Sequence, residues 1–280
     1  MNSKQTLIDH YAADGLRERL TAGLAQAGLA EGPIDWKQLA QLDQFHTRGL
    51  MASSELAEAL DAKAGETLLD LGSGFGGPAR FIAATRGVHV TGIELSDLYV
   101  TIANEFSERT GLSDKAKFVQ GDAAALPFDA NSFDLAWTLH VSMNIEDKSG
   151  FYAGVHRVLK PGGKFAIYDV AKGTTEPVLY PAPWSPVPEF SFLCTLEETR
   201  HQLLESGFTI LTYQDATTEA IGWLSKIQAA APPQPDAPKR VTLGQTIGPQ
   251  VLPMLRNMGQ NFMEGRTRVL RAIVQKPISE

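Results

Sequence analysis

The 280-residue chain carries 25 lysines and arginines against 32 aspartates and glutamates, a net charge of −7. This acidic balance argues against nucleic acid as a partner. No stretch reaches the ~18 apolar residues that a membrane span needs, and the first residues lack the apolar core of a signal peptide. The single cysteine, Cys194, excludes an internal disulfide. We therefore expect a cytoplasmic protein without stable membrane insertion and without a metal site.

The first 62 residues predict helices. Residues 4–29 carry apolar side chains at helical spacing, and two shorter helices are expected over residues 36–42 and 51–57. Two polar and aromatic spots interrupt this pattern, one around Tyr11 and one over residues 43–49, which include His46.

Residues 68–77 read LLDLGSGFGG, an apolar strand that enters a glycine turn, and a helix is expected from Pro78. Glycines let the backbone turn sharply and let a ligand approach without meeting a Cβ. Their spacing also fits the dinucleotide pattern G-x-G-x-x-G, so an NAD(P)-dependent oxidoreductase is one alternative. Asp70 argues against it, because a carboxylate beside the turn repels a pyrophosphate. The same carboxylate would attract the cationic amino-acid end of S-adenosyl-L-methionine (SAM).

Further short strands are expected over residues 88–94, 117–120, 133–139 and 163–170, with helical patterns between them. This alternation predicts right-handed crossovers and a parallel sheet covered on both faces, an α/β doubly wound fold. Ligands of such sheets bind outside the carboxyl ends of the strands. Acids stand at two of these ends: Glu94 can accept hydrogen bonds from both ribose hydroxyls, and Asp122 can accept one from the adenine amine.

Residues 64–172 resemble the class I SAM-dependent methyltransferases of the small-molecule type, both the ubiquinone and menaquinone enzymes and the sarcosine, betaine and phosphoethanolamine enzymes. LDLGSGFGG is similar to their motif I and VTGIELS to their acidic second motif. QGDAAALPFDANSFDLAWTLH resembles motifs three and four, and RVLKPGGKFAIYDV the strand-five motif. Ser73 stands where the family often has cysteine. The resemblance implies a Rossmann-like, seven-stranded, mostly parallel sheet, SAM as cofactor, and as cofactor-binding residues Asp70, Gly72, Ser73, Gly74, Gly76, Glu94, Leu95, Asp122, Ala123 and Leu139.

By the same resemblance, residues 1–62 form an N-terminal helical lid over the cofactor. A tyrosine in the first helix of such relatives faces the site, which makes Tyr11 a candidate for catalysis and acceptor binding. A surface position for Tyr11 is an equal alternative. His46 is a candidate contact of the acceptor.

The segment after the fourth strand, residues 140–148, leaves the sheet at the expected methyl-transfer centre. By resemblance, His140 stands where relatives often carry an acid, and Asn144 where many carry histidine. A general-base role would therefore move to His140, whose ordinary pKa near 6.5 suits proton transfer at neutral pH. The alternative is that His140 only orients the cofactor or water. Asn144 is retained as a catalytic candidate and Met143 as an acceptor contact.

The proline-dense loop over residues 177–186 carries Tyr180 and Trp184. Prolines restrict the free loop, so these aromatics can form an acceptor wall before the ligand arrives. Core packing is the alternative for Trp184. We assign residues 63–215 to the SAM-binding core, 216–265 to a C-terminal helical insertion with a proline-rich linker over residues 229–238, and 266–280 to the last strand, antiparallel near strand five, and the tail. Met254, Met258 and Met263 are expected to be core filler within the insertion.

These features predict an enzyme that moves the SAM methyl group to N, O or C of a small-molecule acceptor, with a secondary metabolite among the candidates. The protein would contribute positioning and a dry site, and the chemistry requires no metal. A non-catalytic SAM-binding protein is a second alternative beside the oxidoreductase. The identity of the acceptor and the oligomeric state stay open.

Overall fold

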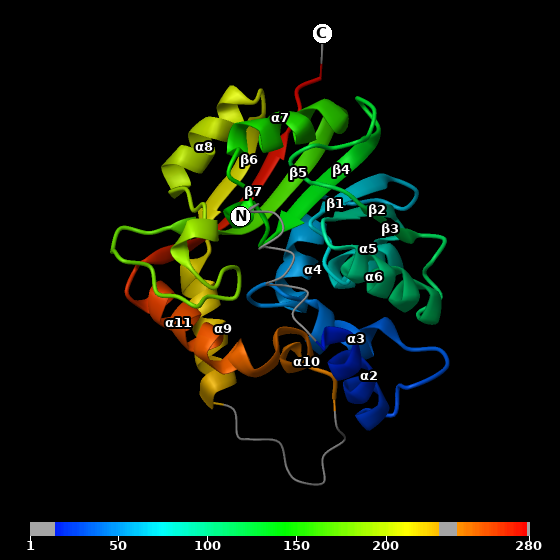
Figure 1. Cartoon of the computed structure of the whole chain (residues 1–280). Helices are drawn as coiled ribbons and strands as arrows, with labels where there is room; N and C mark the ends of the chain where they lie inside the picture. The colour runs from blue at the N-terminus through cyan, green and yellow to red at the C-terminus, as the bar shows by residue number, and fades with distance from the viewer. Residues whose placement is uncertain (1–14, 230–239, 279–280) are drawn as a thin grey trace.

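The computed structural model describes residues 15–229 and 240–278 (Figure 1). Within them, a seven-stranded sheet has the order β3-β2-β1-β4-β5-β7-β6. Strands β1 to β5 pair in parallel, and β7 lies antiparallel between β5 and β6. The predicted α/β fold with a mostly parallel sheet is confirmed. The strand bounds are β1 (Thr67–Leu71), β2 (His89–Glu94), β3 (Ala116–Gln120), β4 (Phe133–Leu139), β5 (Leu159–Lys172), β6 (Thr209–Asp215) and β7 (Thr267–Gln275).

Strand β5 begins earlier than the sequence predicts. Residues 159–162 precede the strand expected over residues 163–170, but they belong to β5 and lie beside the end of β7. The backbone N–H of Gly162 donates to the carbonyl of Lys276, and the N–H of Lys276 donates to the carbonyl of Gly163. The β4–β5 register shifts between Phe133 and Leu135. Gly162 and Gly163 therefore lie at an irregularity inside β5 and not in a turn before it.

Helices cover both faces of the sheet (Figure 1). Leu68 of β1 points into the hydrophobic cluster beneath α4 and α5, whereas Leu69 and Leu71 point into the cluster beneath α7. Strands buried on both sides in this way are typical of a parallel sheet between helical layers. The helix bounds are α4 (Leu50–Ala59), α5 (Gly77–Arg86), α6 (Asp97–Arg109), α7 (Lys148–Val158) and α8 (Leu196–Glu205). A capping box between Thr195 and Glu198 starts α8.

Two segments far apart in the sequence lie side by side below the sheet in Figure 1. One comprises α2 (Leu16–Gln26) and α3 (Trp36–Asp43), and the other comprises α9 (Thr217–Ala229), α10 (Leu243–Ile247) and α11 (Val251–Met263). The Arg19 guanidinium donates to the carbonyl of Gln245 at 3.2 Å, which joins α2 to α10. The segments predicted as lid and insertion therefore contact each other. Residues 4–14 of the first predicted helix and residues 230–238 of the predicted linker lie outside the described residues.

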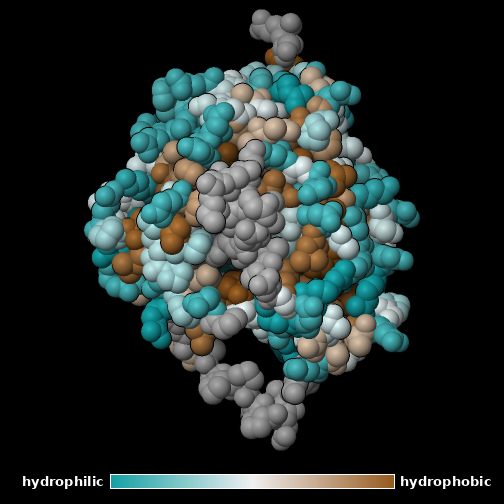
Figure 2. Space-filling model, in the orientation of Figure 1, coloured by the Kyte–Doolittle hydropathy of each residue, from teal (hydrophilic) through white to brown (hydrophobic). Residues whose placement is uncertain are grey.

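The methionines of the insertion differ from the prediction. Met258 is buried as expected, but Met263 is 63% exposed. Figure 2 shows hydrophilic residues along the rim of one face and hydrophobic residues nearer its middle. No helix among residues 15–229 and 240–278 is long and apolar enough to cross a bilayer.

Candidate active site

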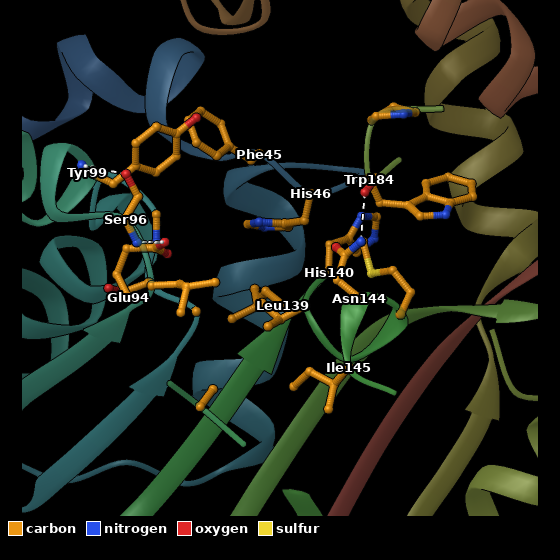
Figure 3. A pocket seen from close by; sticks show the side chains of 18 of the residues that line it. Phe45, His46, Glu94, Ser96, Tyr99, Leu139, His140, Asn144, Ile145 and Trp184 are labelled. Carbon is orange, nitrogen blue, oxygen red and sulfur yellow. Dashed lines mark hydrogen bonds between the residues drawn. The ribbon is translucent and has the colours of Figure 1, made fainter. Parts of the chain in front are cut away.

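A cavity of about 910 Å³ opens at the carboxyl ends of β1, β2 and β4 (Figure 3). Its walls come from the β1–α5 turn, the ends of β2 and β3, the loops after β4 and β5, the α3–α4 loop and the α10–α11 region. This volume lies near the top of the roughly 300–1,000 Å³ range of small-molecule sites. Strand ends bring chemically useful side chains together here as the sequence predicts.

The β1–α5 turn needs its glycines. Gly72 and Gly74 have φ of 70° and 54°, a left-handed conformation that strains other residues. A Cβ on Gly72 would also come within 2.5 Å of the Val141 side chain. Gly76, predicted to bind the cofactor, does not line the cavity. It caps α5, and a Cβ there would collide with Phe118, so the prediction for Gly76 is corrected to a packing role.

Asp70 is the most unusual group of the cavity wall. Its side chain is buried, and Oδ2 has no hydrogen-bond partner in the described part of the chain. Burial, with a smaller contribution from the negative charge of Glu94, raises the pKa of Asp70 to about 7, against the opposing effects of the Trp137 side chain and Arg80. A buried carboxylate oxygen without a donor is costly. A ligand ammonium group would supply the missing donor and favour the ionised carboxylate, so the residues present fit the amino-acid end of SAM.

The carboxylate of Glu94 can accept hydrogen bonds from a second ligand group. Its Oε2 accepts from the backbone N–H of Gly74 at 3.0 Å, and its Oε1 accepts from the N–H of Ser96 at 3.0 Å. Each oxygen retains a lone pair for a hydroxyl donor. Burial raises the pKa of Glu94, and the backbone N–H groups oppose that rise. This arrangement suits a vicinal diol such as a ribose.

The remaining predicted cofactor residues lie along the same wall. Asp122 accepts a hydrogen bond from the N–H of Ala124 at 2.9 Å, within a turn that follows β3. Two aromatic side chains that the sequence analysis did not select, Phe45 and Tyr99, also line the cavity (Figure 3). Their ring centroids are 6.2 Å apart. Tyr99 lies in the apolar periodicity of α6, which gave no signal that its ring reaches the cavity. The other lining residues on this wall are Ser73, Leu95, Ala123 and Leu139.

His140 follows β4 directly and lines the cavity close to Asn144 (Figure 3). Its φ of 55° is uncommon for a residue with a side chain, and such strain is typical of functional sites. Its backbone N–H donates to the carbonyl of Tyr168 at 2.8 Å. Its ring stacks on the Tyr168 ring, with centroids 5.5 Å apart and planes at 18°. Burial, with a smaller contribution from His46, lowers the pKa of His140 well below its ordinary value.

His46 reaches the cavity from the α3–α4 loop, as predicted for an acceptor contact. Its Nε2 lies 2.9 Å from the carbonyl oxygen of Gly49. A carbonyl only accepts, so Nε2 carries the proton. Burial lowers the pKa of His46 to about 4. Both cavity histidines are therefore neutral at pH 7.

Asn144 lines the cavity and joins two of its walls. Its amide Nδ2 donates to the carbonyl of Trp184 at 2.7 Å and to that of Phe190 at 3.3 Å. These bonds tie the loop after β4 to the proline-dense loop after β5. Asn144 therefore positions the proline-dense loop as a wall of the cavity.

The aromatic residues of the proline-dense loop have different places. Trp184 lines the cavity and is also 1% exposed, with its indole N–H donating to Ser191 Oγ at 2.8 Å. The position of Trp184 therefore fits both alternatives, because its side chain lines the cavity and is packed in the core. Tyr180 does not line the cavity but packs against the core cluster, which corrects its place in the predicted wall. Met143 is at the cavity as predicted, and Tyr11 lies outside the described residues.

A second part of the cavity lining, called the apolar half below, comes from the loops after β4 and β5 and from the α10–α11 region. No pattern within the sequence indicates that the α10–α11 region reaches the cavity. Met254, predicted to be core filler, nevertheless lines it. Thr246 and Gln250 add polar groups from the same region. The apolar lining of this half consists of Met143, Pro181, Pro183, Trp184, Pro186, Phe190, Phe192, Ile247 and Met254.

Comparison with known proteins agrees with this geometry. Residues 69–167 match the model of a methyltransferase domain. Over 114 residues the chain is 44% identical to a sterol 24-C-methyltransferase of Gibberella zeae, covering 41% of this chain and 30% of that protein. The chain spans between about a quarter and two fifths of the length of the curated relatives it matches.

Solved structures cover more of the chain at lower identity. The [4+2]-cyclase SpnF matches with a TM-score of 0.66 and 22% identity over 100% of this chain and 98% of that one. A geranyl diphosphate C-methyltransferase from Streptomyces coelicolor matches with a TM-score of 0.72 and 14% identity over 99% and 98%. At these identities the structures show a shared fold. Residues 69–167 thus match a methyltransferase domain, and the fold around them is the one that these solved structures share.

Proposed function

We propose that this protein transfers the methyl group of SAM to an apolar small molecule that carries no phosphate. One observation carries the proposal: a single cavity joins a wall of acidic acceptor groups to a largely apolar half, with His140 between them. Bound SAM supplies a methyl group on a sulfonium. The protein's residues bind the two reactants, hold them in line and exclude water.

Three acids would hold the cofactor. Asp70 pairs with the ammonium, Glu94 accepts from the ribose hydroxyls, and Asp122 accepts from the adenine amine. The unpartnered Oδ2 of Asp70 and the two anchored oxygens of Glu94 support these roles. The helical segments 1–62 and 216–265 would act as lid and insertion around this site, and the contact between α2 and α10 supports a joint covering role.

The charge of the cavity supports an acceptor without phosphate. Among the residues that the structure describes, no lysine or arginine lines the cavity, whereas six acids do: Asp43, Asp70, Glu94, Asp122, Glu146 and Asp147. Asp43 is paired with buried Arg80. The carboxylates of the other acids repel a diphosphate or phosphomonoester, and the repulsion grows in a desolvated site.

The apolar half supports a hydrophobic acceptor. Several relatives are named sterol 24-C-methyltransferases, and we propose a sterol or a molecule of similar apolar character for this chain. A carbon nucleophile is consistent with those names. If the acceptor is a hydroxyl, the S–CH₃ bond breaks as the O–CH₃ bond forms, and the hydroxyl proton passes to neutral His140. General-base assistance contributes about 10²–10⁴-fold when the pKa of the base is near the operating pH, and the lowered pKa of His140 places its contribution toward the lower end of that range.

The experiment uses SAM labelled in its methyl group and a panel of sterols, prenols and quinols, beside geranyl diphosphate and phosphoethanolamine. We expect label in an apolar acceptor and an equal amount of S-adenosylhomocysteine. Both products must be measured, because a structural neighbour with this fold is named a cyclase. Label only in the phosphorylated compounds would refute the acceptor class. Binding of SAM with no labelled product from any acceptor would favour a non-catalytic protein. A cytoplasmic location is part of the proposal, and cell fractionation tests it.

A further inference from the structure

A pair of buried hydroxyls lies directly behind His140. The Nε2 of His140 is 3.2 Å from Thr47 Oγ1, and Thr47 Oγ1 donates to the hydroxyl of Tyr168 at 3.1 Å. Thr47 is 2% exposed and Tyr168 is fully buried. Neither residue lines the cavity. The two hydroxyls therefore act on the cavity only through His140.

This hydrogen-bond chain selects one protonation pattern of the imidazole. A neutral imidazole carries its proton on one nitrogen and a lone pair on the other, and the partner of one nitrogen decides which. The single proton of Thr47 is used in the bond to Tyr168, so Thr47 Oγ1 faces His140 with a lone pair. With the bond in that direction His140 Nε2 is the donor. Its Nδ1 keeps the lone pair and has no hydrogen-bond partner within the described ranges. The reverse direction, from Tyr168 to Thr47 and from Thr47 to Nε2, would place the imidazole proton on Nδ1, and the NMR experiment below distinguishes the two.

The backbone around Thr47 is fixed by ion pairs. The next residue, Arg48, donates through Nη1 to Glu55 Oε2 at 2.8 Å. Glu55 also accepts from Arg271 of β7 at 2.6 Å. These contacts tie the α3–α4 loop to α4 and to the sheet. The stacking of His140 on Tyr168 restricts the imidazole from its other side.

We propose that Thr47 and Tyr168 are positioning residues that hold His140 with its proton on Nε2 and its lone pair on Nδ1. The catalytic consequence rests on the proposed function. When a hydroxyl acceptor is methylated, the S–CH₃ bond breaks as the O–CH₃ bond forms, and the proton of the hydroxyl passes to Nδ1. The Nε2–H remains bonded to Thr47 throughout, so the ring need not turn.

The test reads the protonation pattern directly. Protein labelled with ¹⁵N-histidine is studied by NMR at neutral pH, free and with S-adenosylhomocysteine, and the His140 signals are assigned as those that are missing in His140→Gln. We expect an Nε2–H imidazole in the wild type and in Thr47→Ser, which keeps the hydroxyl. Thr47→Val keeps the shape without the hydroxyl. In it we expect the ratio of the Nε2–H to the Nδ1–H form to fall roughly fivefold, the factor that one neutral hydrogen bond supports.

Either of two results would overturn the proposal: an Nδ1–H imidazole in the wild type, or an unchanged pattern in Thr47→Val. Tyr168→Phe provides a second variant, because it removes the acceptor of the Thr47 proton and preserves the ring. The affinity for S-adenosylhomocysteine should stay within about twofold in all these variants, since neither residue lines the cavity. The NMR pattern can be read without turnover, so failure of the proposed methyl transfer and failure of this inference give different results.

Discussion

Replacing Asp70 with asparagine should stabilise the cofactor-free protein while weakening its binding of the cofactor. Burial raises the pKa of Asp70 from 3.8 to about 7 in the folded protein. The folded state therefore binds this proton more tightly than the unfolded state between those two pH values. Stability falls as the pH rises from about 4 to about 7, and the loss is complete above pH 7.

The size of the effect follows from the two pKa values. A rise from 3.8 to about 7 corresponds to about 4 kcal/mol against the ionised form. Asparagine has the shape of the protonated acid and cannot ionise, so Asp70→Asn should recover up to about 4 kcal/mol at pH 8 and little at pH 4. At roughly 2 °C per kcal/mol for a large domain, the melting temperature of the free protein should rise by several degrees at pH 8.

Binding should change in the opposite direction. A hydrogen bond to a charged group contributes about 1.5–3 kcal/mol, so Asp70→Asn should weaken S-adenosylhomocysteine binding roughly 10- to 100-fold at pH 8. In the wild type, affinity should rise as the pH approaches 7, because the ligand ammonium requires the ionised carboxylate. Calorimetry in two buffers of different ionisation enthalpy should detect proton release near pH 6.

Glu146→Gln is the matched control, since it removes one exposed acid from the cavity lining. It should leave both the melting temperature and the affinity close to wild type. An Asp70→Asn protein that is no more stable at pH 8 than the wild type and binds the ligand equally well would refute the reasoning about this carboxylate.

Three further predictions follow from the cavity walls. Arg80 is 1% exposed and donates to Asp43 at 2.8 Å. Asp43→Ala leaves its buried charge unpaired, so urea unfolding should show that the free energy of unfolding falls by about 3–5 kcal/mol. A fall below 1 kcal/mol would contradict a buried ion pair. His140→Gln should lower turnover of a hydroxyl acceptor by about 10²–10⁴-fold and leave the affinity for S-adenosylhomocysteine unchanged. Turnover equal to that of the wild type would refute the general-base role of His140. Asn144→Ala frees the wall loop from two hydrogen bonds, so KM for the acceptor should rise several-fold in steady-state assays while ligand binding at the glycine turn stays constant.

The sequence predicts the cofactor wall well because its residues lie where local patterns end. Asp70, Glu94 and Asp122 each follow or close a short apolar strand, and parallel strands bring their carboxyl ends to one edge. The acceptor half depends on contacts between distant segments. Met254 reaches the cavity because α10 packs on α2 and α3, and no periodicity within residues 216–265 contains that contact.

The residues that contact His140 could not be predicted from local sequence patterns either. The left-handed backbone at His140 turns its ring onto Tyr168, and Thr47 arrives from a loop 93 residues earlier in the chain. Tyr180, in contrast, was predicted to line the cavity but does not line it. Its place in a proline-dense loop suggested a cavity wall, but the loop turns the ring against the core. Gly76 was included with its neighbours in the turn, although its lack of a side chain serves packing against Phe118.

The most direct test of the central claim is a calorimetric titration of the purified protein with S-adenosylhomocysteine and, separately, with NADH. Every charged residue that lines the cavity in the described part of the chain is acidic, which favours a cofactor with a cationic end and disfavours a pyrophosphate. We predict micromolar binding of S-adenosylhomocysteine and no measurable binding of NADH. Binding of NADH alone would contradict a methyltransferase function and restore the oxidoreductase alternative.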